Sequence, residues 1–403
     1  MSRREETFDI AIVGGGAMGC ATAFHLKRLD PGLSIVVIER DPTYATASSA
    51  RSLGSIRQQF SAPVNMALSR LGFEFLREAG RLLAVDGLEP DVALRERGYL
   101  YLATPEGAGA LREKHATQRA CGADIALLPA ADLAARYPWL ATGDLALGRL
   151  GLRGEGWFDG EGLLHALRRK ARSLGVVFLA GEAQALRLAP SKVLGIDVMA
   201  CCDRDGGAAL TRIACAAVVN AAGPHAADVA RMAGIDLPVV PLRQCVFVLE
   251  CPQRLAGMPL VIDPGGTWFR PEGTRYLAGA PPREAESPAN RTLDVDHALF
   301  EDTIWPALAH RVPAFEALRV TSAWAGFYEM NTFDQNAIIG RAPGLDNLYL
   351  INGFSGHGLQ QAPAAGLALA ELIVHGVYRT LDVSVLGFDR IAAARPVREA
   401  NVI

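Results

Sequence analysis

The sequence has little lysine and no excess of charge of either sign. Its 40 basic residues stand against 43 acidic ones, and the net charge is −3. Only Lys27, Lys114, Lys170 and Lys192 are lysines, so the basic residues are almost all arginine. This balance gives no electrostatic reason to expect binding to nucleic acid or to an anionic membrane.

Paired cysteines and long apolar runs are also lacking. The seven cysteines form no CxxC pair, so we expect neither a metal site nor a disulfide framework, and a reducing compartment fits this pattern. No apolar run is long enough to span a bilayer, and the leading MSRREET has no apolar segment typical of a signal peptide. We therefore expect a cytoplasmic protein with no integral membrane segment, and leave peripheral contact with a membrane open.

The first 39 residues carry the strongest motif in the chain. Phe8 to Val13 is an apolar run typical of a buried strand, and Ala17 to Leu29 has the pattern of a helix. Between and just after them stand the glycines of a G-x-G-x-x-G motif, Gly14, Gly16 and Gly19. An acidic residue, Glu39, ends the next apolar run, where it can accept hydrogen bonds from a ribose. The pattern predicts a dinucleotide site with phosphates at the helix N-terminus; the alternative is an ordinary strand, turn and helix.

Three later segments are suited to a flat, anionic ligand. The loop from Arg40 to Arg57 contains Ser48, Ser49 and Ser52, which can bind a phosphate or a ring, or can simply face solvent. Asn220 to Gly223 ends a buried strand in small residues, which lets a cofactor pass close by. The sequence GFSGHG (353–358) precedes a helix, and its glycines allow backbone N–H groups to approach a ring.

The hydrophobic pattern predicts an α/β protein with an α+β part. Parallel-strand signals occur at the start, middle and end of the chain, whereas residues 241–279 alternate in the manner of an antiparallel sheet. We therefore predict a Rossmann-like nucleotide domain that is discontinuous in sequence, and a substrate domain built on a mainly antiparallel sheet. The nucleotide domain is expected over 1–92, 154–238 and 338–403, and the substrate domain over 93–153 and 239–337. Helices are expected over 65–84, 108–122, 129–137, 162–174, 293–308 and 359–375.

Together these motifs resemble a known group of flavoproteins. The first-strand motif, the serine-rich loop, NAAG (220–223), WAGFYEMNTFDQNAIIG (324–340) and GFSGHGLQQAP (353–363) resemble the D-amino-acid oxidase and sarcosine/glycine oxidase superfamily of FAD proteins. IRQQFS (56–61), GWFD (156–159), RVPAFE (311–316) and NTFDQN (331–336) resemble its subfamily of FAD-dependent oxidoreductase domain-containing proteins, linked to assembly of mitochondrial respiratory complex I. With no transit peptide recognised, the chain is expected to be a bacterial relative of that subfamily.

The resemblance implies FAD and a set of residues around it. The ADP half would contact Gly14, Gly16, Ala17, Met18, Gly19, Glu39 and Arg40, with Ala183 at the adenine. Ser48, Ser49, Arg51 and Ser52 would line the flavin or its diphosphate. The isoalloxazine ring would be surrounded by Ala222, Gly223, Gly353, Ser355, Gly356, His357, Gly358 and Gln360.

The sequence departs from this superfamily in ways that bear on chemistry. WAGFY has no cysteine and ASSARS no histidine at the positions where some members bind flavin covalently, so we expect noncovalent FAD. The carboxylate-binding arginine of amino-acid oxidases falls at or beside Tyr328, and the lysine of sarcosine oxidases at Gln360; Arg57 or Arg270 can supply the missing cation. The lysine that assists oxygen reduction would align near Leu277, which predicts slow reaction with oxygen.

The resemblance therefore predicts oxidation of a C–N bond in a small amine or amino acid by hydride transfer to flavin N5. A dehydrogenase is expected rather than an oxidase, with a quinone, a flavoprotein or O2 as acceptor. Tyr328, His357 and Arg57 are the candidate catalytic residues; the alternatives for them are packing, a loop contact and a surface ion pair. Two other functions stay open: an assembly flavoprotein for complex I-type machinery with little catalysis, and the β-type subunit of a hetero-oligomeric sarcosine oxidase. A protein partner or oligomer is compatible with all three.

Overall fold

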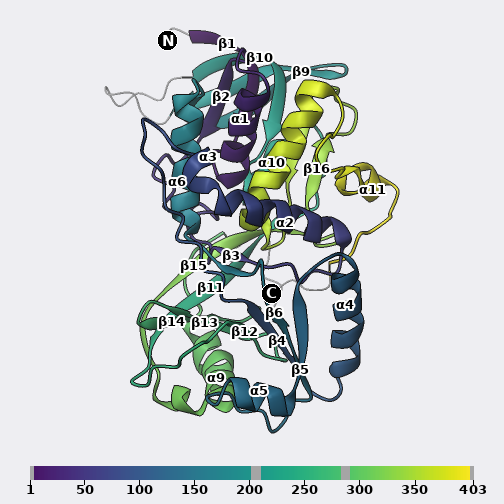
Figure 1. Ribbon diagram of the computed structural model, residues 1–403. Coiled ribbons are helices and arrows are strands. Elements are labelled where there is room, and N and C mark those ends of the chain that lie inside the picture. The colour runs from purple at the N-terminus through teal and green to yellow at the C-terminus, as the bar shows by residue number, and fades with distance from the viewer. Residues whose placement is uncertain (1–3, 201–209, 283–290, 400–403) are drawn as a thin grey trace.

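The computed structural model describes residues 4–200, 210–282 and 291–399, and two sheets dominate it (Figure 1). Cys201 and Cys202 lie outside these ranges, and the five cysteines within them are all free thiols. No helix in the described ranges is long and apolar enough to cross a membrane.

The first sheet has seven strands and a parallel centre. Along the parallel run β8-β2-β1-β10-β17 each strand pairs with the next, β9 lies antiparallel between β8 and β10, and β16 is an antiparallel edge. The strands are β1 (Arg4–Val13), β2 (Ile35–Glu39), β8 (Val177–Ala189), β9 (Lys192–Ala200), β10 (Leu210–Asn220), β16 (Ile338–Arg341) and β17 (Leu348–Asn352). Strands β2 and β17 are apolar along nearly their whole length because helices or other strands cover both faces of this part of the sheet.

Four helices cover one face of this sheet and build its largest core. Helix α1 (Ala17–Leu29) packs against α10 (Gly358–His375) and α6 (Gly160–Ser173), and α2 (Pro63–Arg77) packs on α10. Gly366 permits the close crossing of α1 and α10, since a Cβ atom there would lie 2.8 Å from the backbone carbon of Ala21. The opposite face is covered by α7 (Ala226–Arg231) and its neighbours.

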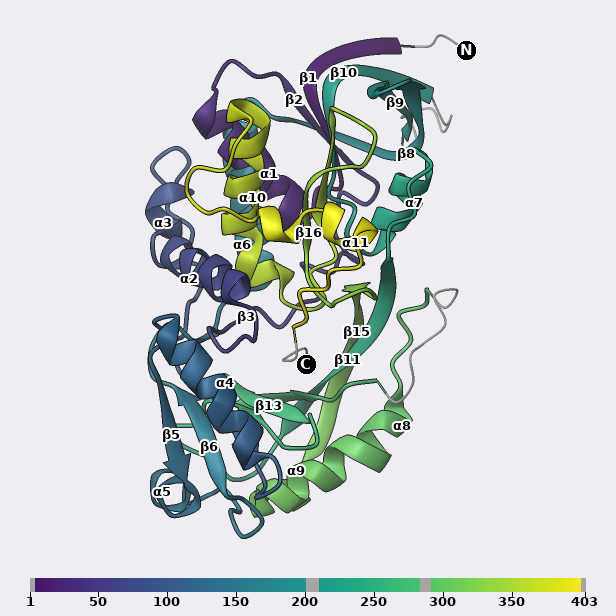
Figure 2. The ribbon, with the colours of Figure 1, turned by 90° about the vertical axis from the view of Figure 1, so that its right-hand side faces the viewer.

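The second sheet has eight strands in the order β15-β11-β14-β13-β12-β4-β6-β5. All neighbouring pairs are antiparallel except β12 and β4, which confirms the predicted mainly antiparallel sheet. Its strands are β4 (Tyr99–Ala103), β5 (Ile125–Pro129), β6 (Leu147–Gly151), β11 (Val239–Glu250), β12 (Leu260–Ile262), β13 (Trp268–Glu272), β14 (Arg275–Gly279) and β15 (Arg319–Asn331). Figure 2 shows β11 and β15 as the long strands that rise from this sheet toward the first one.

Helices pack on both faces of the second sheet. Helices α5 (Ala130–Arg136) and α9 (Trp305–Arg311) pack on the outer face, and α4 (Ala108–Ala120) covers part of the inner face. The remaining short elements are a β3–β7 ribbon (Ser55–Ile56 with Gly156–Trp157), α3 (Ala79–Leu82), α8 (His297–Leu299), α11 (Asp389–Ala392) and 3₁₀ turns at Gly223–His225, Pro313–Ala317 and Ser384–Leu386.

Most predicted elements are present, and the exceptions have local causes. The helix predicted over 65–84 is broken at Glu78 into α2 and α3, and the one predicted over 293–308 begins only at His297. Phe300–Ile304 forms a π turn, because Pro306 in the next turn has no N–H to continue the α-helical hydrogen bonds. Strands β3, β5, β6, β7, β9 and β16 have no counterpart among the predicted strands. Every strand of the two sheets falls in the segments predicted for its domain, and the exact domain boundaries stay a prediction.

Candidate FAD and substrate site

Two adjoining cavities lie between the glycine turn and the second sheet. The turn cavity borders the Gly14–Gly16 turn, the end of β2 and η1 (Gly223–His225). The sheet cavity borders β11, β12, β13 and β15 of the second sheet and the GFSGHG loop. Six residues line both cavities, so the two form one path: Ala17, Met18, Ser48, Ser49, Phe327 and Glu329.

The three glycines of the turn have different surroundings. Gly14 has φ +101°, and a Cβ atom there would lie 2.3 Å from the carbonyl oxygen of Ala221, the residue after β10 whose N–H donates to the carbonyl oxygen of Val13 on β1 over 2.9 Å. Gly16 lines the turn cavity. Gly19 lines neither cavity; it packs helix α1 against the turn, since its Cβ atom would lie 1.9 Å from the Gly14 carbonyl oxygen.

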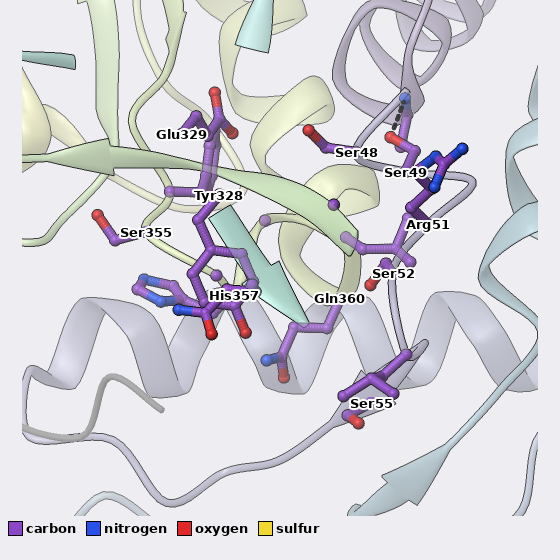
Figure 3. A pocket seen from close by; sticks show the side chains of 18 of the residues that line it. Ser48, Ser49, Arg51, Ser52, Ser55, Tyr328, Glu329, Ser355, His357 and Gln360 are labelled. Atoms are coloured by element: carbon purple, nitrogen blue, oxygen red, sulfur yellow. Dashed lines mark hydrogen bonds between the residues drawn. The ribbon is translucent and has the colours of Figure 1, made fainter. Parts of the chain in front are cut away.

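The N-terminus of α1 faces the place where the two cavities meet. Its N-cap residue, Gly16, supplies no side-chain cap, and the N–H of Ala17 donates to Ser49 Oγ over 3.1 Å (Figure 3). Ser48 Oγ is buried and has no hydrogen-bond partner among the described residues. A free hydroxyl beside a helix N-terminus is a suitable site for a phosphate group.

Glu39 is held in position for a diol. Its two carboxylate oxygens accept the N–H groups of Gly15 (2.8 Å) and Asp41 (2.9 Å), and it lines the turn cavity together with Ala183, Ala222 and Gly223. Arg40 lies at the rim of this cavity, where its Nη2 is 2.6 Å from Nε2 of His225. The turn cavity thus contains the residues predicted for the ADP half, except Gly19.

The GFSGHG loop follows β17 and forms one wall of the sheet cavity. Gly356 lies directly under the ring of Tyr328, and a Cβ atom there would lie 2.4 Å from it. Ser355 is tied to β15, since its Oγ accepts the N–H of Asn331 over 3.0 Å. Gly353 lines neither cavity, but its N–H donates to Glu329 Oε2 over 3.1 Å. Gly356, His357, Gly358, Ser355 and Gln360 all line the sheet cavity.

His357 is neutral in this environment. Burial, reinforced by the charge of Arg57, lowers the pKa of His357 to about 4. Neither ring nitrogen has a hydrogen-bond partner in the part of the chain that the structure describes. An imidazole with two unsatisfied nitrogens that lines a cavity is available to a ligand.

Arg57 is buried and lines the sheet cavity, and contacts of its backbone and its guanidinium hold it in place. Its N–H donates to Gln360 Oε1 over 2.9 Å, its Nη1 donates to Tyr101 Oη over 2.9 Å, and its Cζ lies 4.1 Å from the ring centre of Phe60. Gln360 therefore fixes the backbone of Arg57. The alternative of a surface ion pair for Arg57 does not hold.

Arg270 does not take the role considered for it. It is buried, its guanidinium binds Glu272 and the carbonyl oxygens of Leu53 and Pro271, and it lines neither cavity. Trp268 and Arg270 are two residues apart and share one face of β13, but the guanidinium of Arg270 is held by Glu272 and by the loop carbonyl oxygen of Leu53, whereas Trp268 lines the sheet cavity.

The serine-rich loop is held by its own contacts as well as by the second sheet. Arg51 Nη1 donates to the carbonyl oxygen of Ala325 over 2.9 Å, and Ser52 Oγ accepts the N–H of Gly54 over 3.3 Å. Both residues line the sheet cavity, and Figure 3 shows them below Ser48 and Ser49.

Sequence reasoning missed several cavity residues that depend on tertiary structure. Tyr99 on β4 and Trp268 on β13 line the sheet cavity, and Glu329 lines both cavities. Glu329 stands in the WAGFYEMN segment next to Tyr328, so a carboxylate in an otherwise apolar and small-residue stretch was the signal available.

The residues present fit FAD. The turn leaves no space for a Cβ atom on Gly14, the α1 N-terminus and the orphaned Ser48 hydroxyl face the junction, and Glu39 is oriented by two N–H groups. A path from an acid-lined cavity past a helix N-terminus to a glycine loop matches a ribose, a diphosphate and a ring in that order.

Comparison with known proteins identifies the class. Residues 9–372 match the family model described as FAD dependent oxidoreductase, and the chain belongs to this family. Its cofactor is accordingly FAD.

Among individual proteins, the chain is 41% identical to "FAD-dependent oxidoreductase domain-containing protein 1" of Xenopus laevis, over 99% of this chain and 85% of that protein. It is 28% identical to "Glycine oxidase" of Geobacillus kaustophilus, over 91% and 93% of the two chains. The structure of L-proline dehydrogenase from P. horikoshii has the same fold, with a TM-score of 0.82 at 23% identity over 97% of this chain and all of the other.

Proposed function

We propose that this protein oxidises the C–N bond of a small amine or amino acid, and passes the electrons to an acceptor other than oxygen. FAD supplies the chemistry by accepting a hydride. The chain's own residues bind and orient the substrate, exclude water and control which groups carry protons.

The observation that supports this most is the position of Arg57. Its guanidinium borders a cavity whose walls include Val246, Leu260, Ile262 and Trp268. A buried cation beside an apolar wall suits an amino acid, because charge-assisted hydrogen bonds hold the carboxylate and the apolar wall receives the side chain. Loss of one such bond costs about 1.5–3 kcal/mol, or roughly 10- to 150-fold in affinity.

The two other candidate catalytic residues are suited to orienting the substrate and not to taking its proton. Burial raises the pKa of Tyr328 to about 12, so the phenol stays protonated and can donate a hydrogen bond. His357, with its pKa lowered to about 4, accepts a hydrogen bond from an amine but is too weak a base to remove its proton at neutral pH. The substrate amine should therefore bind deprotonated, and kcat/KM should rise with pH until the free amine predominates.

The scarcity of lysine favours a dehydrogenase. None of the four lysines lines either cavity. Leu277, at the position where the superfamily's oxygen-assisting lysine would align, is buried in β14 and lines neither cavity in the described part of the chain. Without a lysine at that position to stabilise reduced oxygen species, slow reoxidation in air is expected.

The test is anaerobic bleaching of the bound flavin by a panel of N-methyl, D- and L-amino acids, with their amides as neutral controls. We expect at least one amino acid to bleach the flavin. Arg57→Met should lower the affinity for that amino acid about 10- to 150-fold and leave the affinity for the matching amide unchanged. Reoxidation is then followed in air and with a quinone. Bleaching by none of the compounds would refute the proposal and favour the assembly function; oxidase-like reoxidation in air would refute only the choice of acceptor.

A further inference from the structure

Glu329 is a carboxylic acid at the narrow junction of the two cavities. It lines both of them, whereas its neighbour Tyr328 faces the sheet cavity from the other side of β15 (Figure 3). Any FAD molecule that places its phosphates at the α1 N-terminus and its ring at the GFSGHG loop must pass this junction.

The GFSGHG loop holds Glu329 there. Glu329 Oε2 accepts the N–H of Gly353 over 3.1 Å, and the backbone oxygen of Glu329 accepts the N–H of Ser355 over 3.1 Å. On the other side is η1, since a Cβ atom on Gly223 would lie 3.9 Å from Glu329 Oε2. The only polar contacts of this carboxylate within the described ranges are backbone N–H groups, and no ion pair reaches it there.

The lack of a cationic partner affects the protonation of this acid. Burial raises the pKa of Glu329 to about 7, and the N–H groups of Gly353 and Phe354 only partly oppose this shift. Both protonation states are therefore accessible under ordinary conditions.

The other charged or titratable groups on the elements packed around Glu329 keep a single protonation state near pH 7. Burial, with Arg40 and Arg291 nearby, lowers the pKa of His225, and hydrogen bonds from Arg291 hold the pKa of Asp228 far below its usual range. The remaining neighbours are Tyr328 on β15, Arg243 on β11 and His357 on the GFSGHG loop, and of these Tyr328 stays protonated and His357 neutral near pH 7.

We propose that Glu329 contacts the bound FAD where it passes between the two cavities, and that the protonation state of this carboxyl group sets how readily the flavin accepts electrons. Reduction brings two electrons, and with them negative charge, onto the flavin. An ionised carboxylate beside it opposes that change, whereas a protonated carboxyl donates a hydrogen bond and favours it. The proton comes from solvent through the two cavities and returns there on reoxidation. This inference depends on FAD and not on the substrate proposed above.

The test uses the FAD-loaded protein and no substrate. Reduction potentials are measured between pH 5 and 9 by dye equilibration for the wild type, Glu329→Gln and a matched control, Glu371→Gln. Glu371 is also a carboxylate bound by backbone N–H groups, those of Arg379 and Thr380, but it is buried and lines neither cavity.

We expect the reduction equilibrium of the wild type and of Glu371→Gln to change by up to tenfold more per pH unit than that of Glu329→Gln across pH 6–8, since one additional proton is taken up. Equal pH dependence in all three proteins would overturn the proposal. A second measurement needs no substitution: the absorption spectrum of oxidised flavin should titrate between pH 6 and 8 in the wild type, and a spectrum that stays constant over that range would also overturn it.

Discussion

Arg390 on α11 secures the loop behind the flavin site, and replacing it by methionine should destabilise the protein strongly. Its guanidinium forms two hydrogen bonds with Asp334, of 2.8 and 3.0 Å, and others with the carbonyl oxygens of Leu386, Gly387, Asn336 and Ala337. The side chains are 5% and 0% exposed. Asp334 in turn accepts the Nδ2–H of Asn331, the residue whose backbone N–H binds Ser355.

Arg390→Met leaves a buried carboxylate without its cation, which costs about 3–5 kcal/mol. With an unfolding entropy of about 2.1 cal/mol/K per residue, a chain of 403 residues loses roughly 1 °C of Tm per 0.85 kcal/mol, so the expected decrease is about 4–6 °C. FAD should also dissociate more readily, because the anchor of the GFSGHG loop is loosened.

Thermal unfolding and release of FAD fluorescence measure both effects. Arg81→Met is the matched control. Arg81 pairs with Glu78 over 3.0 Å, but the two side chains are 70% and 54% exposed, so the loss in free energy of unfolding should be at most about 1 kcal/mol. The double variant Arg390→Met/Asp334→Asn should recover part of the loss, since no buried charge is left. An Arg390→Met protein with the Tm of the Arg81→Met control would refute this reasoning.

Two further outcomes follow from the geometry. Gly14→Ala should abolish FAD retention, measured as flavin co-purifying with the protein, because the new Cβ atom would meet the Ala221 carbonyl oxygen at a φ of +101°; normal flavin content would contradict the role given to the turn. Glu399→Gln should destabilise the protein by about 1.5–3 kcal/mol at pH 7, because its buried carboxylate accepts the N–H groups of Ser61 and Ala62. Although burial raises the pKa of Glu399, the charges of Arg57 and other neighbours hold it below its usual value, so the difference between wild type and variant in urea unfolding should be full at pH 7 and shrink as the pH falls below about 4; a difference independent of pH would contradict this account.

The parts of the site that sequence predicts well are those made by local geometry. The turn at Gly14 requires a positive φ and a residue without a Cβ atom, independently of the rest of the chain. Glu39 ends the neighbouring strand, β2. The helix predicted over Ala17–Leu29 has those exact bounds, since its neighbours in sequence already define its ends.

The parts it predicts poorly depend on pairing between distant segments. Arg57 and Arg270 have the same chemistry, and only the burial of one against Tyr101 and of the other against Glu272 separates them. Glu329 is significant because β15 brings it between Gly223 and Gly353, which lie 130 residues apart in sequence. No local sequence pattern predicts that segments so far apart in sequence will lie side by side.

The separation of Gly14 and Gly353 also bears on how the protein is made. The ribosome adds about 5–20 residues per second, so roughly 17–70 seconds pass between synthesis of the glycine turn and synthesis of the GFSGHG loop about 340 residues later. During that time the nascent chain holds one half of the cofactor site without the other. FAD can be bound at both ends only after the last parallel strand, β17, has paired with β10. Cofactor binding is therefore a late step in the folding of the newly made chain.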